Sequence, residues 1–320
     1  MTIQAKKETK TRTTGLKASK IKSQFPLFLM TLPGIILTFM FAYIPMFGVI
    51  LAFKKINLRQ GILGSPWIGF KNFSYLFKSN DLYIMVRNTL GYNIGFILIG
   101  TVLCVSMAVG LSIMRNKMTS KVFQTILIMP HFLSMIIVSY LVLAFLNMEH
   151  GFVNKFLKTY FGTEPINWYI EPKYWPLILN IVNAWKENGF SSIIFISTIA
   201  GIDVQLYEAA SIDGATGWQK VRHITLPMLR TIICIQLILS VGNILGGDFG
   251  LFYQVPMNSG ALSDVTTTIP VYVYNNITAG GPRALGFASA VSFMQSVVGC
   301  ILVVTTNLIV KRIDSESSLF

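Results

Sequence analysis

Long uncharged apolar segments are the feature that most constrains the fold of this chain. The hydrocarbon core of a bilayer is about 30 Å thick, so a helix needs about 20 apolar residues to cross it. The segments 25–53, 88–114 and 284–310 contain no charged residue, and 122–148 contains only His131. Helices of this length in a soluble protein would carry charges on one face. The four segments are therefore predicted to span a membrane.

Two further segments complete the prediction of six spans. The segment 174–202 is interrupted only by Lys186 and Glu187, and 227–247 is uncharged from residue 231 onward. Composition agrees, because 12% of the residues are charged whereas soluble domains carry about 25%. The sequence therefore predicts an all-α integral membrane protein, a six-helix bundle over residues 25–312. The tails 1–24 and 313–320 lie outside the bundle.

The distribution of basic residues predicts the orientation in the membrane. The chain has 26 Lys and Arg against 13 Asp and Glu, a net charge of +13. With the N-terminus inside, 15 basic residues lie on the inner segments and 9 on the longer outer ones. We therefore expect a multi-pass protein of the cell membrane with cytoplasmic N- and C-termini, and no nucleic-acid partner. The basic tail 1–24 is predicted to be disordered and solvated, with contact to anionic membrane lipid as an alternative.

Several kinds of chemistry are absent from the sequence. The three cysteines lie in apolar stretches and form no CxxC pair, which argues against a disulfide framework and a zinc site. No GxxxxGK[ST], HExxH or GxSxG sequence occurs. We expect no catalytic residue, no metal site and no cofactor in this chain, and hence no enzyme.

The segment 203–227, predicted to face the cytosol, is much longer than a connector needs to be. Asp203 is a good N-cap for a helix over 204–211, which Gly214 and Gly217 would end. A second short helix is predicted over 218–224, with Pro227 opening the fifth span. Helix connections usually take about 2–8 residues. A docking surface is therefore favoured over a passive loop.

The residues of this segment resemble a known motif. Glu208-Ala209-Ala210, Asp213-Gly214-Ala215 and the closing Ile224-x-Leu226-Pro227 resemble the EAA motif of binding-protein-dependent ABC importer permeases. Further stretches resemble the polysaccharide- and oligosaccharide-type permeases of the maltose-importer (type I) superfamily: Trp185-Lys-x-x-Gly189, Pro66-Trp-Ile-Gly-Phe-x-Asn72-Phe, Asp248-Phe-Gly-Leu-Phe-Tyr253 and Tyr272-Val-Tyr274. The resemblance covers about residues 25–312.

The resemblance implies a role and partners. The residues of a coupling helix seated on a cytosolic ATPase would be Glu208, Ala209, Ala210, Asp213 and Gly214. The partners would be a second permease subunit, two ATPase subunits that bind ATP and magnesium, and an extracellular solute-binding protein. The implied function is ATP-driven import of a carbohydrate, an oligosaccharide or a polysaccharide fragment. A secondary transporter or channel subunit working without ATP is the alternative, although six helices without a visible inverted repeat are few for a secondary transporter.

Lys186 and Glu187 interrupt the fourth predicted span. A charge at the bilayer centre costs about 2.5–3.5 kcal/mol on insertion scales. Because consecutive residues do not face each other on a helix, each is predicted to have a partner elsewhere, a protein-lined cavity, or a helix break near Asn188. Two roles remain open: lining of the translocation path or pairing with the companion permease, and an internal polar lock.

Other polar residues within the spans are candidates for contact with a sugar. Amide side chains offer hydroxyl-rich solutes both donors and acceptors, but hydrogen bonds between helices explain them equally well. The candidates for the translocation path, besides Lys186 and Glu187, are Asn183, Gln236, Asn243 and Gln295.

Overall fold

The computed structural model describes residues 26–57, 59–114 and 116–313. The predicted tails 1–24 and 313–320 lie outside these residues, apart from Ile313 at the end of the last helix. Helices joined by short turns make up the described part, and its only β-type pairing is a single bridge between Lys54 and Trp67. The prediction of an all-α fold is confirmed.

The chain divides into two compact units, residues 1–51 and 52–320. The described part of the first unit belongs to one helical stretch, Pro26–Phe53. A π-helical turn (Phe39–Tyr43), the short α2 (Ile44–Met46) and a 3-10 turn (Phe47–Phe53) follow its regular part. Apolar side chains are exposed all round this helix, as expected of a segment that faces lipid.

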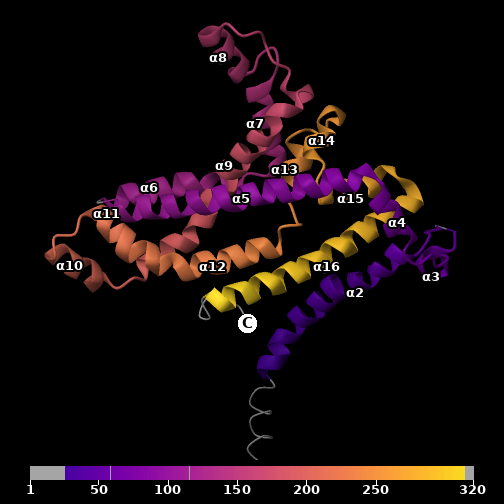
Figure 1. The fold of residues 1–320 in the computed structure, drawn as a ribbon, viewed down its shortest axis with the longest axis horizontal. Helices are drawn as coiled ribbons and strands as arrows, with labels where there is room; N and C mark the ends of the chain where they lie inside the picture. The colour runs from indigo at the N-terminus through magenta and orange to yellow at the C-terminus, as the bar shows by residue number, and fades with distance from the viewer. Residues whose placement is uncertain (1–25, 58, 115, 314–320) are drawn as a thin grey trace, which may run out of the picture. The chain divides into compact units, whose positions relative to one another are not determined.

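The second unit contains the remaining helices, which Figure 1 labels. They are α3 (Gly61–Gly64), α4 (Lys71–Lys78), α5 (Asn80–Ile113), α6 (Lys117–Ile128), α7 (Met135–Leu146), α8 (Phe152–Phe161), α9 (Trp175–Ala200), α10 (Val204–Ile212), α11 (Gly217–Lys220), α12 (Leu226–Gly242), α13 (Phe249–Gln254), α14 (Ser263–Thr266), α15 (Ile269–Ala279) and α16 (Gly281–Ile313). Short 3-10 and π turns link several of them.

Four helices are long and apolar enough to cross a membrane: Pro26–Phe53, Asn80–Ile113, Gly217–Gly242 and Ala284–Arg312. Two bent pairs pass the same test when each pair is taken together, which brings the number of candidate spans to six. One pair is Lys117–Phe132 with Met135–Leu146, bent by 99°, and the other is Pro172–Ala200 with Val204–Ile212, bent by 67°. The second bend separates α9 from α10.

The bend of 99° replaces the single span predicted over 122–148. Pro130 lies in a 3-10 turn that follows α6, and Leu133 is extended, with φ −73° and ψ 134°. The next residue, Ser134, caps α7 by accepting a hydrogen bond from the Ile137 amide at 3.3 Å. A proline followed by a capping serine ends one helix and starts another, so the chain turns here.

The fifth span also differs from the prediction. The separate helix predicted over 218–224 is the start of one continuous helix, Gly217–Gly242. A π-helical turn (Val221–Thr225) joins α11 to α12, and Pro227 lies just after it. Proline removes one backbone donor and crowds the preceding turn, and a wider π turn accommodates both effects. The helix ends at Gly242, earlier than the predicted residue 247.

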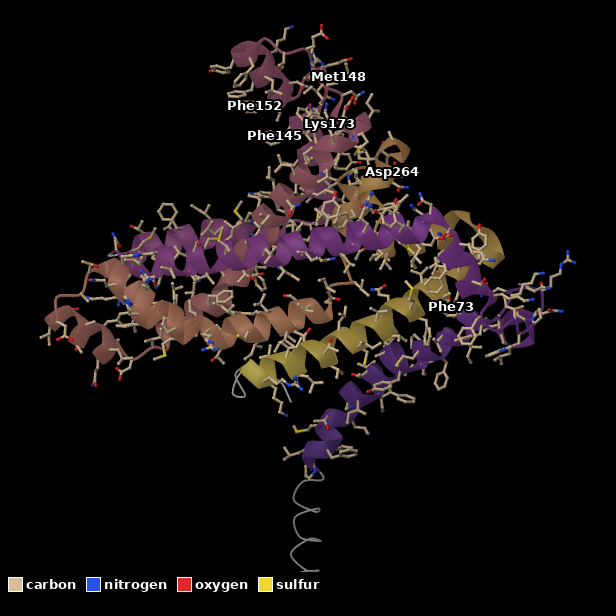
Figure 2. All side chains as sticks on the ribbon, viewed as in Figure 1. Phe73, Phe145, Met148, Phe152, Lys173 and Asp264 are labelled. Atoms are coloured by element: carbon tan, nitrogen blue, oxygen red, sulfur yellow. The ribbon has the colours of Figure 1, made fainter. Side chains whose placement is uncertain are left out.

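Within the second unit, α9 packs against α5, and α16 packs against both α12 and α15 (Figure 1). The largest buried cluster joins α7, α9 and α13 and contains the fully buried side chains of Trp175, Leu251 and Val138. Trp175 donates its indole N–H to the Trp168 carbonyl at 2.7 Å. At the junction of α7 and α8, the rings of Phe145 and Phe152 lie 6.1 Å apart (Figure 2).

Candidate functional site

The α10 segment, residues 203–216, presents the residues of the predicted docking surface. Asp203 accepts a hydrogen bond from the Gln205 amide at 3.0 Å, so it is the N-cap that the sequence predicts. Glu208 and Ala209 are exposed on α10, and Ala210 is half-buried. The acidic side chain and the adjacent small residue are therefore open to a partner surface.

A glycine turn ends α10 and fixes the direction of the chain beyond it. Gly214 has φ +78°, a conformation that L-residues rarely adopt. The Ala215 amide donates to the Ala210 carbonyl at 2.9 Å, and the Gly214 amide donates to the Ser211 carbonyl at 3.1 Å. This pair of bonds is the Schellman arrangement, which satisfies carbonyls that the helix end leaves free.

The following helix begins with an equally defined cap. Thr216 accepts a hydrogen bond from the Gln219 amide, and the Gln219 side chain accepts one from the Thr216 amide at 2.7 Å. The loop is thus fixed at both ends by its own hydrogen bonds. A hollow of about 320 Å³ opens beside it, lined among others by Asp213, Gly214 and His223.

Two side-chain contacts join the α10 segment to the helix that follows. The hydroxyl groups of Tyr207 and Thr225 lie 2.9 Å apart, and Thr225 is buried. Lys220 donates to the Ser211 hydroxyl at 2.6 Å. A force applied to α10 therefore reaches the long helix Gly217–Gly242 through side chains as well as through the backbone.

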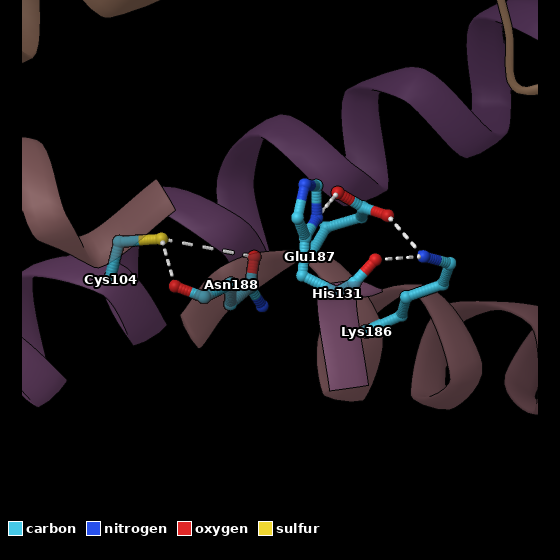
Figure 3. A network of polar contacts seen from close by, with 5 residues as sticks. All are labelled: Cys104, His131, Lys186, Glu187 and Asn188. Carbon is cyan, nitrogen blue, oxygen red and sulfur yellow. Dashed lines mark hydrogen bonds and ion pairs between the residues drawn. The ribbon is translucent and has the colours of Figure 1, made fainter. Parts of the chain in front are cut away.

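A polar cluster of three residues lies where the broken span meets α9 (Figure 3). Lys186 is buried and donates to the His131 carbonyl at 2.8 Å. Glu187 lies 2.9 Å from Nδ1 of His131 and 3.5 Å from the Lys186 ammonium. The His131 ring stacks on Phe190 with centroids 4.2 Å apart. The cluster ties the 3-10 turn Met129–Phe132 to the middle of α9.

The next two residues of α9 bring its backbone against two neighbouring helices. A Cβ added to Gly189 would lie 1.8 Å from the Leu127 carbonyl oxygen, so only glycine allows α6 this close. On the other side, the Cys104 thiol of α5 contacts the Asn188 carbonyl at 3.3 Å, also drawn in Figure 3. Residues 186–190 therefore form the joint between α5, α6 and α9.

This geometry corrects part of the expectation for Lys186 and Glu187. Both have a partner on another segment, as predicted, but they also contact each other although they are consecutive. Their long side chains reach each other because both lean toward His131. The helix break, one of the three alternatives, does not occur, since α9 runs through Asn188 and Gly189. The contacts are those of an internal polar lock, and a role in the translocation path stays a prediction.

The remaining path candidates are spread over three helices. Asn183 lies on α9, Gln236 on α12 and Gln295 on α16, all half-buried, while Asn243 is exposed just beyond the end of α12. Within residues 26–57, 59–114 and 116–313, no hydrogen bond joins any two of them. Their contact with a substrate also stays a prediction.

His131 is the functional candidate that the sequence did not single out. Its signal was its position as the only residue between 122 and 148 that can carry a positive charge. An ionisable group within a membrane span usually has a specific partner, but the partner here lies 56 positions further along the chain. Periodicity and spacing carry no information about such a distant pair.

The helical fold, the candidate spans and the exposed α10 segment define the class of multi-pass membrane proteins. Comparison with known families gives the family itself. The family described as "Binding-protein-dependent transport system inner membrane component" matches residues 100–315, so this chain belongs to it. The family predicted from the EAA-like motif is thereby confirmed.

Two relatives and one solved structure show how closely this chain resembles known members. It is 33% identical over 298 residues to the polygalacturonan/rhamnogalacturonan transport system permease protein YteP of Bacillus subtilis (strain 168), covering 93% of this chain and 91% of the relative. It is also 33% identical over 291 residues to Protein LplB of the same strain, covering 91% of this chain and 90% of that protein. The crystal structure of a bacterial ABC transporter involved in the import of the acidic polysaccharide alginate contains a chain that matches with a TM-score of 0.83 and 32% identity. That match covers 92% of this chain and 98% of the other.

Proposed function

We propose that this chain is the permease subunit of an ATP-driven importer for acidic oligosaccharides or polysaccharide fragments. The α10 segment carries the proposal, because it presents Glu208 and Ala209 on a short helix capped at both ends and tied to a long span. Such a helix suits docking onto a cytosolic ATPase that moves during its cycle. Both termini would then be cytoplasmic.

The proposed assembly contains this chain, a second permease subunit, two ATPase subunits and an extracellular solute-binding protein. ATP and magnesium would be bound by the ATPase, since this sequence contains no P-loop. The solute-binding protein in this assembly is supported by the crystal structure of the bacterial alginate ABC transporter in complex with an alginate pentasaccharide-bound periplasmic protein, which matches with a TM-score of 0.82 and 32% identity.

The acidic character of the substrate is supported by the relatives. Polygalacturonan, rhamnogalacturonan and alginate are named for the first relative and for the solved transporter. The predicted outer segments carry 9 basic residues against 6 acidic ones, a small excess that is compatible with an anionic solute.

Affinity purification of the tagged chain tests the assembly. We expect stoichiometric recovery of a cytosolic ATPase and a second six-helix chain. Recovery of a stable homo-oligomer without an ATPase would overturn the proposal in favour of transport without ATP.

The substrate is tested on the same complex in nanodiscs. The solute-binding protein loaded with oligogalacturonate or oligoalginate is expected to stimulate ATP hydrolysis several-fold. The matched control is the same binding protein incubated with a neutral maltooligosaccharide. Equal stimulation by the neutral sugar would contradict the acidic substrate class but leave the importer assignment in place.

A further inference from the structure

A cavity of about 670 Å³ lies between the α10 segment and the ends of the bundle helices. Its lining residues come from the end of α5, the start of α6, the end of α9, α10 and the α11–α12 junction, elements that meet at one end of the second unit in Figure 1. Its volume is within the range of about 300–1,000 Å³ typical of small-ligand sites. Neither the EAA-like motif nor the polar lock uses it.

The lining of this inner cavity is amphipathic. Aliphatic side chains make up most of its wall: Leu111, Ile196, Ile199, Ile202, Val204 and Val221. Polar groups are contributed mainly by α6 and by the α11–α12 junction, where Lys117, Gln124 and Lys220 line the cavity. Among the described residues that line the cavity, two are lysines and none is an aspartate or glutamate, and most of the others are apolar.

Lys117 occupies a position that is unfavourable for a cation unless an anion is present. It is the first residue of α6, where the helix dipole is positive, and its side chain is exposed. The side chain of Asn116 already accepts hydrogen bonds from the amides of Met118 and Thr119. The lysine contributes nothing to that cap, and its charge adds to the positive field of the helix end.

We propose that the inner cavity binds an anionic phospholipid from the cytoplasmic leaflet, with its headgroup at Lys117 and Lys220 and an acyl chain along the aliphatic wall. Basic pockets between helices at the cytoplasmic face of membrane proteins are suited to anionic headgroups. The aliphatic wall favours a lipid over a soluble phosphate, which would leave that wall facing water. The cytoplasmic placement rests on the proposed function.

The bound lipid would act on the α10 segment. Tyr207 and Thr225, whose hydroxyl groups lie 2.9 Å apart, both line the inner cavity. Lys220 lines it as well and donates to Ser211 of α10. A lipid held there packs against the inner side of α10 and stabilises one position of this helix relative to the bundle. Anionic lipid is thus expected to increase the ATP hydrolysis that substrate stimulates.

Native mass spectrometry of the assembled transporter tests the binding, with phosphatidylglycerol and phosphatidylcholine as probes. We expect the complex to retain phosphatidylglycerol about tenfold better than phosphatidylcholine. The double variant Lys117→Gln/Lys220→Gln should lose this preference. Lys121→Gln is the matched control, because it removes the same charge one turn further along α6 and does not line the inner cavity. Equal retention of the two lipids by the unmodified complex would overturn the proposal.

A second variant keeps both charges and fills the space. Ser112 lines the inner cavity at the exposed end of α5, and Ser112→Trp is expected to displace the lipid and to abolish stimulation by phosphatidylglycerol in nanodiscs. If both Ser112→Trp and the double lysine variant still retain phosphatidylglycerol preferentially, the proposal is overturned. If the control Lys121→Gln also loses this preference, the effect is one of general surface charge, and the proposal is overturned too. Substrate-stimulated ATP hydrolysis in pure phosphatidylcholine reports the proposed function separately.

Discussion

The hydroxyl groups of Tyr207 and Thr225 lie 2.9 Å apart and connect α10 to the start of the long helix that follows it. Thr225 is buried with 3% of its surface exposed, so its hydroxyl depends on this contact. The bond therefore links an exposed helix to the interior of the bundle. Its removal provides the first test of how motion of α10 is transmitted.

Tyr207→Phe is expected to destabilise the protein by about 1 kcal/mol and to lower the amount of substrate transported per ATP hydrolysed. The phenyl ring stays, while the buried Thr225 hydroxyl loses its partner. Thermal unfolding and transport in proteoliposomes measure the two effects. Thr225→Val should have a similar effect, and the double variant should cost less than the sum of the two. Strict additivity would show that the two hydroxyl groups do not interact.

Glu208→Lys is expected to leave folding intact and to uncouple ATP hydrolysis from transport. The side chain is exposed on α10, so its replacement disturbs no core contact, while the reversed charge meets the docking surface of the partner. Glu149→Lys, an exposed charge reversal in another segment, is the control and should transport normally. Full substrate uptake by Glu208→Lys in reconstituted vesicles would defeat the assignment.

Gly214→Val is expected to disrupt the α10 turn, where Gly214 has φ +78°. An ordinary L-residue in this left-handed conformation costs about 1–2 kcal/mol, and a β-branched residue costs more. The Schellman bonds at the end of α10 would then be lost. Recovery of the ATPase in affinity purification measures the effect. Gly217→Ala is the control, since no atom lies within 4 Å of its added Cβ. Equal ATPase recovery by both variants would count against this role for Gly214.

Gly189→Ala is expected to separate α9 from α6 and to lower the free energy of unfolding of the purified protein by about 1–3 kcal/mol, measured by thermal unfolding. The added methyl group would collide with the backbone carbonyl of Leu127, which no side-chain rotation relieves. Gly110→Ala on α5 is the matched control, because its Cβ meets nothing within 4 Å. That variant should be as stable as the unmodified protein or more stable. A Gly189→Ala protein of unchanged stability would refute the close contact.

Lys186→Met is expected to lower the free energy of unfolding by about 3 kcal/mol, because it leaves the Glu187 carboxylate without its ammonium partner. This is the lower end of the range of about 3–5 kcal/mol for breaking a buried pair, since Glu187 is 33% exposed. The double variant Lys186→Met/Glu187→Gln removes both charges and should recover much of that loss. Thermal unfolding provides the comparison. If both variants are as stable as the unmodified protein but fail to transport, the residues line the translocation path and do not form a lock.

The helices were predictable from the sequence to different degrees. Whether a segment can span a membrane depends on about 20 consecutive residues, so the apolar segments identified all six candidate spans. The turn at Gly214 was also predictable from neighbouring residues, because a glycine after a short helix indicates a left-handed cap. The continuous helix through Pro227 was missed, since proline near a helix start and proline after a π turn look alike in sequence.

The polar lock was predictable only in part. The burial cost of Lys186 and Glu187 left three alternatives, namely a partner elsewhere, a protein-lined cavity or a helix break, and the structure has the first of them. The identity of that partner depends on the bend at Leu133 and Ser134, which brings His131 to α9. The residues around His131 and those around Glu187, taken separately, do not indicate that the two side chains meet.

The glycine contact between α6 and α9 also limits how these two helices can move. At Gly189 the backbone of α9 lies directly against the Leu127 carbonyl, with no side chain between them. A contact between two backbones has no side chain that can change rotamer to let one helix slide past the other. We therefore expect α9 to turn about this contact when α10 is displaced, so that the half of α9 that starts at Trp175 moves in the opposite direction.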